Sequence, residues 1–229
     1  MERIPPVIIV VILFFTAIIA FSILVWGGLP LRQDRNISAL TQVEVRDYEG
    51  ARLSSLADFR ENSIRGPQYL SAEAYRLEIG GLVRNPRSLS YDEILTRVPQ
   101  YEKKVTLFCV EGWDVTILWE GVRVKDLLAD AGIVPGANTV IFHAADGYST
   151  SLPLDYILER DILLAHTMNR VRLPAERGFP LQLVAEDRWG YTWITWVTRI
   201  QVSDDPSYQG YWEQRGFSQS GDIRKSSFT

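Results

Sequence analysis

Hydrophobic and polar residues alternate over much of the chain in short runs, a pattern that predicts short strands mixed with short helices. Apolar and β-branched residues recur at every second position, or in short blocks bounded by turn residues, in several segments. Strands are predicted within the following segments: 74–83, 103–110, 116–133, 138–154, 154–168, 179–187 and 191–203.

Four short helices are predicted before and between these strands. The segment 53–64 offers Ser54 or Ser55 as an N-cap, and 88–98 has Ser90 followed three residues later by Glu93, which is a capping-box pattern. Two more helices are predicted, one before Gly132 and one at the start of 154–168. Strands and helices follow no regular βαβ order, and the sequence has neither a G-x-G-x-x-G motif nor an internal repeat. We therefore expect one α+β domain and disfavour a Rossmann fold.

The most hydrophobic part of the chain is residues 7–26, which carry no charge over twenty positions. Twenty helical residues span about 30 Å, the thickness of a bilayer core, and Trp26 suits an interfacial position. The alternative is a cleaved signal peptide, but the run is longer than a usual signal-peptide core and no A-x-A site follows it. We expect a retained single-pass anchor that binds membrane lipid.

These patterns divide the chain into three parts. Residues 1–30 are the expected transmembrane anchor, 31–60 a linker and lead-in segment, and 61–229 the folded domain with a C-terminal tail. A bacterial plasma membrane is the expected location. Basic residues on the two sides of the anchor are too evenly spread to fix the side on which the domain lies.

Composition excludes one class of partner. The chain has 46% hydrophobic and 23% charged residues and a net charge of −4, without a run of Lys and Arg. This argues against nucleic acid as a partner. No C-x-x-C-H haem motif is present either, so an electron-transfer partner would be another chain.

Cys109 is the only cysteine, and it lies at the end of the predicted strand 103–110. It could be a small buried hydrophobe, a nucleophile paired with His143 or His166, or a metal ligand. One Cys and two scattered His make a poor zinc site. A metal at Cys109 would therefore need a cofactor to supply most of its donors.

Several motifs occur in a fixed order: "CVEGW" (109–113), "FHAADGY" (142–148), "ERGFPLQLV" (176–184) and "WGYTWITWV" (189–197). Together they resemble the molybdopterin-binding domain of the sulfite oxidase family, over about residues 60–210 and closest to its short bacterial members. The resemblance implies the sulfite oxidase-like α+β fold with mixed sheets. It also implies that the Cys109 thiolate binds molybdenum, together with two sulfurs from the dithiolene of Mo-molybdopterin.

The same resemblance nominates further site residues, all read as expectations. Asp146 and Tyr148 join Cys109 as candidate catalytic residues. The candidate cofactor-binding residues come from four loops: Asn62, Arg65 and Gly66; His143; Arg177 and Gln182; Thr192, Trp193, Ile194 and Thr195.

The last of these loops departs from the family. Relatives usually carry lysines where this chain has Thr192 and Thr195, and the cofactor ends in a phosphate that cations would bind. The loss would weaken cofactor binding unless Arg188 or Arg177 compensates. No twin-arginine pair precedes the apolar run, although exported relatives usually carry one.

Two functions from different classes follow. The first is a membrane-anchored molybdopterin-dependent oxidoreductase that acts on a small oxyanion, sulfoxide or similar compound and exchanges electrons with a haem or quinone protein in the membrane. The second is a cofactor-free, non-catalytic subunit of a larger membrane electron-transfer complex. Retention of Cys109 favours the first, and Thr192 and Thr195 favour the second.

Overall fold

The computed structural model describes residues 37–228, and the first few of these belong to a separate compact unit that spans residues 1–42. Within that unit residues 37–40 are helical, and the Thr41 N–H donates to the Ile37 carbonyl at 3.0 Å. The expected anchor at 7–26 lies outside the described residues. Across 37–228, the structure contains no helix of the length and hydrophobicity that a bilayer crossing requires.

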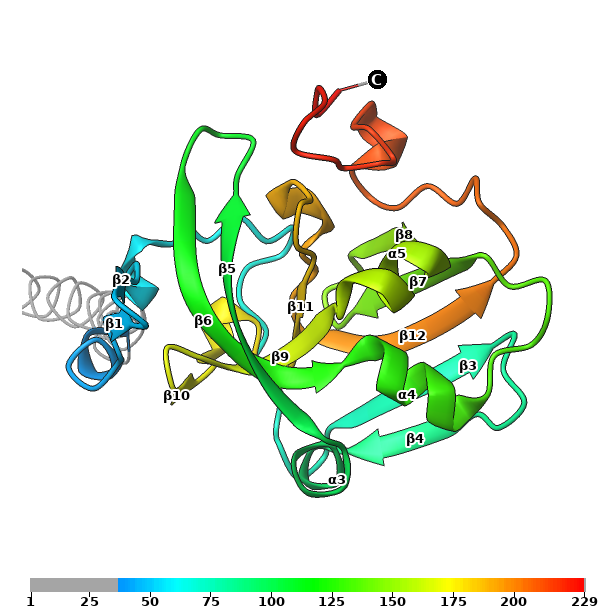
Figure 1. Ribbon diagram of the computed structural model, residues 1–229, viewed down its shortest axis with the longest axis horizontal. Helices are drawn as coiled ribbons and strands as arrows, with labels where there is room; N and C mark the ends of the chain where they lie inside the picture. Colours follow the sequence, from blue (N-terminus) through cyan, green and yellow to red (C-terminus); the bar gives the residue numbers. More distant parts are fainter. Residues whose placement is uncertain (1–36, 229) are drawn as a thin grey trace, which may run out of the picture. The chain divides into compact units, whose positions relative to one another are not determined.

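The second unit begins at Val43 and contains two five-stranded sheets (Figure 1). The first sheet has the order β10-β9-β6-β5, and β11 also pairs with β9; all of its pairs are antiparallel. Its strands are β5 (Gln100–Phe108), β6 (Asp114–Arg123), β9 (Leu163–Met168), β10 (Val171–Arg172) and β11 (Gln182–Val184). The long β5–β6 hairpin places residues 109–113 at its tip.

The second sheet has the order β4-β3-β12-β7-β8, in which only the β12–β3 pair is parallel. Its strands are β3 (Arg76–Gly81), β4 (Arg87–Ser90), β7 (Thr139–Ala144), β8 (Ser149–Pro153) and β12 (Val197–Ser203). A small two-stranded sheet, β1 (Asp47–Tyr48) with β2 (Ala51–Arg52), completes the set. The mixed sheets confirm the α+β class.

The helices are short, and their ends follow from local sequence. Helix α3 (Tyr91–Arg97) begins at the predicted capping box, in which the Ser90 side chain accepts from the Glu93 N–H at 3.2 Å. Helix α4 (Val124–Ala131) ends at Gly132, whose φ of 71° suits glycine. The other helical segments are α5 (Leu154–Arg160) and the 3₁₀ turns η1 (Leu56–Asp58), η2 (Ala175–Arg177), η3 (Gly190–Thr192) and η4 (Glu213–Arg215).

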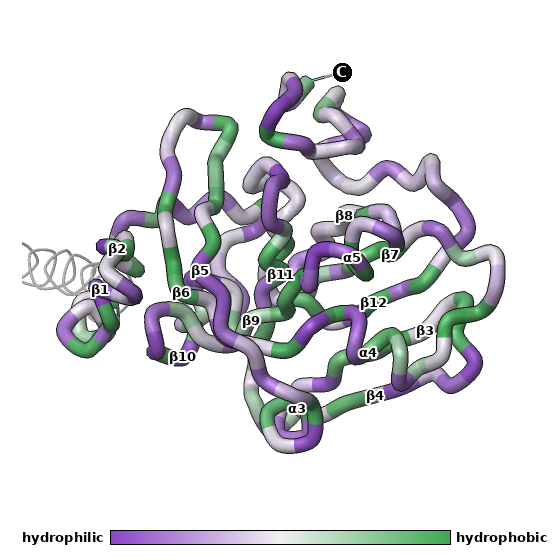
Figure 2. Tube along the Cα trace, in the orientation of Figure 1, coloured by the Kyte–Doolittle hydropathy of each residue, from purple (hydrophilic) through white to green (hydrophobic). Residues whose placement is uncertain are grey.

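Hydrophobic residues lie along the strands of both sheets, and the outer loops are mostly hydrophilic (Figure 2). The largest buried side chains include Trp119 on β6, Phe142 on β7 and Trp196 before β12. Helix α4 turns its apolar face inward, with Val124, Leu128 and Ala131 buried.

Two sequence expectations differ from the structure. The sequence predicts a linker and lead-in over 31–60, whereas the compact unit begins at Val43, and Leu53 and Leu56 belong to its core. The strand expected over 191–203 starts only at Val197. Residues 190–192 form a 3₁₀ turn, and Trp196 has a φ of 52°, so the chain leaves the extended conformation where its aromatic side chains turn inward.

Candidate functional site

A cavity of about 560 Å³ opens beside the tip of the β5–β6 hairpin. Five parts of the chain form its wall: residues 59–64, the hairpin tip, the turn after β7, the segment from η2 to β11, and the loop 190–196. Trp212 and Phe217 from the C-terminal tail complete it. Segments far apart in sequence therefore meet here, as expected of a ligand site.

Cys109 lies at this wall, directly after the last residue of β5. Its N–H donates to the Trp113 carbonyl at 2.9 Å, which closes the hairpin tip. The Asn62 side chain approaches it, with Nδ2 at 3.9 Å from Sγ. Burial raises the pKa of the thiol; the backbone N–H of Glu111 lowers it, the charge of the Glu111 side chain raises it, and Arg60 lowers it, with a net rise. The raised pKa means that the Cys109 thiol keeps its proton at neutral pH unless a metal or a further cation binds beside it.

Neither histidine forms a pair with this thiol. His143 Nε2 lies 3.3 Å from Gln201 Oε1, and His166 Nε2 lies 2.8 Å from Gln100 Oε1. Neither ring lines the cavity, and burial lowers the pKa of both. A Cys–His nucleophilic pair is therefore absent from the described residues. His143, which the sequence nominates for the cofactor, contacts the side chain of Gln201 on β12 and does not reach the cavity.

The other nominees from that loop do reach the cavity. Asp146 is buried, and its Oδ1 accepts from the Tyr148 N–H at 2.9 Å, which shapes the turn after β7. The Tyr148 hydroxyl donates to the Tyr191 carbonyl. Burial raises the pKa of Tyr148 well above its ordinary value, so the hydroxyl keeps its proton. Tyr148 thereby ties this turn to the loop 190–196.

The first nominated loop is divided between the cavity and its outside. Asn62 lines the cavity, whereas Arg65 and Gly66 do not. Arg65 lies near the turn after β7, since a methyl group at Gly147 would be 3.8 Å from Arg65 Nη2. Gly66 has a φ of 75°, a left-handed conformation that suits glycine.

Arg177 and Gln182 are both buried and both line the cavity. The Arg177 guanidinium donates to the carbonyls of Leu56 at 3.1 Å and of Phe59 at 3.2 Å. A third bond, at 3.1 Å, goes to the Glu176 carbonyl. Burial lowers the pKa of Arg177. Arg177 therefore fastens the lead-in segment to η2.

The loop 192–195 places its two threonines differently. Thr195, Trp193 and Ile194 line the cavity. Thr192 does not; it is fully buried, and its hydroxyl donates to the Trp189 carbonyl at 2.9 Å. A lysine at position 195 could reach a ligand in the cavity, but one at 192 has no such path.

Arg188, the other cation considered as a replacement for the lysines, also lies outside the cavity wall. Its guanidinium carbon sits 4.2 Å from the centre of the Tyr156 ring, and its Nη1 lies 3.9 Å from Asp222 Oδ2. Arg188 therefore does not replace a lysine in the cavity.

Four charged residues at the wall were not nominated from the sequence: Arg60, Glu61, Glu111 and Glu176. Carboxylates outnumber guanidinium groups there: Glu61, Glu111, Asp146 and Glu176 face Arg60 and Arg177. Glu176 Oε2 and Ser63 Oγ are buried without a hydrogen-bond partner in the protein. The only sequence signal for Glu176 is its position next to Arg177 in the segment 176–184.

The residues at the cavity wall suit several chemical features of Mo-molybdopterin. The thiol supplies a ligand for a soft metal, and the unpartnered Glu176 and Ser63 atoms would accept or donate hydrogen bonds to a polar ring. The part of the chain that the structure describes has no cluster of three His, Cys, Asp or Glu residues able to hold a metal alone. The wall therefore fits a metal held by Cys109 and an organic cofactor, although the cofactor phosphate would meet no lysine.

Comparison with known proteins agrees with this chemistry. The family model described as "Oxidoreductase molybdopterin binding domain" matches residues 64–212. The uncharacterized oxidoreductase YuiH of Bacillus subtilis is 36% identical over 68% of this chain and 78% of its own length. Chicken sulfite oxidase is 31% identical over 70% of this chain and 42% of its own length.

A third relative, named putative protein-methionine-sulfoxide reductase subunit YedZ1, of Azospira oryzae, is 33% identical over 66% of this chain and 57% of its length. Among solved structures, the sulfane dehydrogenase SoxCD from Paracoccus pantotrophus superposes with a TM-score of 0.59 and 25% identity. That match covers 66% of this chain and 42% of the other. Two of these three sequence relatives are thus much longer than the matched region. The chain belongs to the oxidoreductase molybdopterin-binding domain family and carries a domain of the sulfite oxidase type.

Proposed function

We propose that this protein is a membrane-anchored, molybdopterin-dependent oxidoreductase in which Cys109 is the protein ligand of molybdenum. One observation carries the proposal: the only thiol of the chain lies at the wall of a 560 Å³ cavity with buried polar atoms that lack partners. Hydrolytic or nucleophilic chemistry is less well supported, because neither His143 nor His166 is placed to activate the thiol.

The residues at the wall have distinct tasks in this proposal. When bound, the molybdenum cofactor would supply two-electron oxygen-atom transfer to or from a small substrate. Cys109 would ligate as the thiolate, which the metal charge would stabilise against the raised pKa of the free thiol. Asn62 Nδ2 would donate towards the sulfur and orient it. Gln182, Trp193 and Ile194 would contact the cofactor, and Tyr148 would hold its loop.

Membrane attachment and electron exchange also belong to the proposal. Residues 7–26 would anchor the domain in the bilayer, and a haem or quinone protein in the same membrane would exchange electrons with it. One relative is named as a subunit of a putative protein-methionine-sulfoxide reductase, and this supports a partner chain.

The decisive measurement is molybdenum per chain, by elemental analysis of full-length protein purified in mild detergent from its native host. A ratio near one is expected. Cys109→Ser is the matched control, since it replaces sulfur by oxygen at nearly constant size, and its ratio should fall to about a tenth or less. A wild-type ratio near zero in folded protein would overturn the proposal.

The alternative, a cofactor-free subunit, has one observation in its favour. Four carboxylates and two guanidinium groups line the cavity, and one of the guanidinium groups, that of Arg177, is occupied by backbone carbonyls. Such a wall would repel an anionic phosphate. A molybdenum-free chain that co-purifies in fixed ratio with membrane redox proteins would support this alternative.

A further inference from the structure

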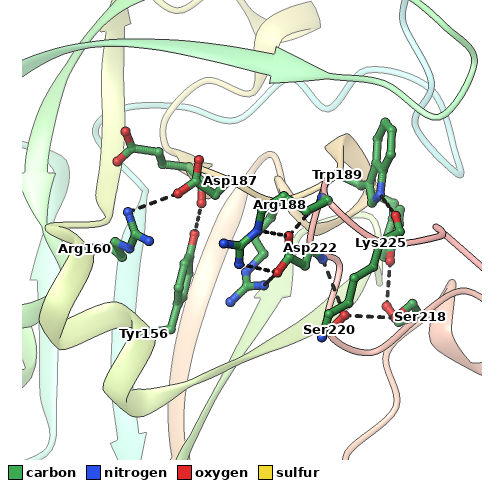
Figure 3. Close-up of polar contacts among 12 residues, drawn as sticks. Tyr156, Arg160, Asp187, Arg188, Trp189, Ser218, Ser220, Asp222 and Lys225 are labelled. Carbon is green, nitrogen blue, oxygen red and sulfur yellow. Dashed lines mark hydrogen bonds and ion pairs between the residues drawn. The ribbon is translucent and has the colours of Figure 1, made fainter.

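The end of the chain lies against the loop that precedes β12. Residues 213–228, here called the C-terminal strap, follow the last residue of the family match, at 212. The strap runs beside residues 187–193 (Figure 3). The Trp189 N–H donates to the Gly221 carbonyl at 2.7 Å, and the Ile223 N–H donates to the Asp187 carbonyl at 3.2 Å. Between these two bonds, Arg188 and Asp222 form an isolated antiparallel bridge.

Side chains reinforce this pairing. Asp222 is buried, and its carboxylate accepts from Arg224 at 2.9 Å and 2.6 Å and lies 3.9 Å from Arg188. These cations hold the pKa of Asp222 far below its usual range, so the carboxylate stays charged. The Tyr191 hydroxyl donates to the Ser218 carbonyl at 2.6 Å.

The loop that the strap holds lies directly on the segment of Cys109. Trp189 and Phe108 form a parallel bridge at the end of β5. A methyl group at Gly190 would lie 3.3 Å from the Phe108 carbonyl oxygen and 3.6 Å from Cys109 Cα. Trp189 therefore contacts both the strap, through Gly221, and the end of β5, through Phe108.

We propose that the C-terminal strap is the positioning element for Cys109. The strap holds Trp189 and Gly190 against the end of β5, and this contact fixes where the thiol stands at the cavity wall. Phe217 of the strap also lines the cavity, so one segment shapes the wall and orders its thiol. The proposal goes beyond the proposed function, because it concerns a coupling within the chain that exists with or without a bound cofactor.

Gly221 offers a way to loosen the strap selectively. It has a φ of 58°, and a methyl group there would lie 2.6 Å from Thr192 Cγ2. Gly221→Ala should therefore push the strap away from the loop. We expect amide hydrogen exchange to rise about tenfold in peptides covering 187–193 and also in those covering 107–113. Exchange in α4 should stay unchanged. The experiment uses the full-length chain.

Two further variants make the result specific. Thr192→Ser removes the clashing methyl and keeps a hydroxyl for the Trp189 carbonyl, so adding it to Gly221→Ala should reverse most of the rise at 107–113. Gly132→Ala is the matched control: its φ is 71°, but the nearest atom to a new methyl is Arg84 Cβ at 3.6 Å. It carries a similar backbone strain at a site remote from the strap and should leave 107–113 unchanged.

If Gly221→Ala unfolds the chain, Asp222→Asn is a second way to loosen the strap. It removes the charge that pairs with Arg224 and Arg188 and keeps the shape of the side chain. It should raise exchange at 107–113 in the same direction. The proposal is overturned if exchange rises only within the strap and the loop, or if Gly132→Ala raises it at 107–113 to the same extent. A molybdenum ratio of zero would overturn the proposed function, but it would not affect the hydrogen-exchange test of the strap.

Discussion

Thr192 and Thr195 are three positions apart in one loop, yet they face different parts of the molecule. Thr195 lines the cavity, while Thr192 is fully buried beside the C-terminal strap. Sequence comparison treats both as replaced lysines that would bind the cofactor. In the structure only position 195 can act on a ligand, because a side chain at 192 would have to displace Gly221.

We expect Thr195→Lys to increase the molybdenum bound per chain, because an ammonium group would enter a wall whose charged groups are mainly carboxylates and could pair with a phosphate. Thr195→Met is the matched control, since it has a long side chain without charge, and it should give no increase. Elemental analysis under identical expression measures both. Equal ratios in the two variants would show that charge at 195 does not limit loading.

Thr192→Lys should instead destabilise the fold by about 2 kcal/mol or more, because it buries a charge and crowds Gly221. Urea unfolding of Thr192→Lys beside Thr195→Lys measures the difference in the free energy of unfolding. Similar unfolding free energies would contradict the different positions of the two side chains.

His166 predicts a pH dependence of stability. Burial lowers its pKa from 6.5 to about 4, so the folded state holds the neutral ring while the unfolded chain binds a proton below pH 6.5. The free energy of unfolding should therefore fall as pH drops from about 6.5 to 4, by roughly 2–3 kcal/mol. His166→Gln should flatten this slope in urea titrations. Parallel curves for the two proteins would assign the slope to other groups.

At the scale of elements, the lead-in segment is part of the domain. Leu53 and Leu56 are buried, and the Ser54 N–H donates to the Thr116 carbonyl at 2.8 Å on β6. Glu44 accepts from the Asn169 side chain at 3.0 Å, and Arg177 binds the Leu56 carbonyl. These bonds place Asn62 and the rest of its loop at the cavity.

A chain that starts at residue 43 should therefore keep a cooperative unfolding transition, whereas one that starts at residue 61 should lose it or be several kcal/mol less stable. Burial of two leucine side chains contributes about 1.5–3 kcal/mol each, and the loss would leave the buried donors of Arg177 unpaired. Circular dichroism with urea compares the two chains. Equal stability would show that 43–60 packs only weakly.

At the scale of the whole molecule, the apolar run at 7–26 predicts where the protein is found. The full-length chain should remain in the membrane fraction after alkaline carbonate washing, because twenty uncharged residues would form a helix of about 30 Å, which is long enough to span the bilayer core. A chain that starts at residue 43 should be released into the supernatant. Immunoblotting of both fractions measures this. Release of the full-length chain would contradict the anchor.

The sequence by itself determined much of this protein. Capping residues and alternation predicted α3, α4 and most strands, because these signals act over a few neighbouring residues. The order of motifs predicted the family, which the family model confirms. The expectation that Cys109 is a metal ligand stays a prediction, and so does the membrane anchor.

Only the tertiary structure decided which nominated residues meet. It brought Asn62, Asp146 and Gln182 to the cavity of Cys109 and placed His143 and Thr192 elsewhere. It also placed Glu176 and Phe217 of the C-terminal strap at the cavity, and the sequence had nominated neither residue for the site. The physical reason is that a side chain's direction depends on strand register and long-range packing. Neither quantity can be read from the spacing of residues within a single loop.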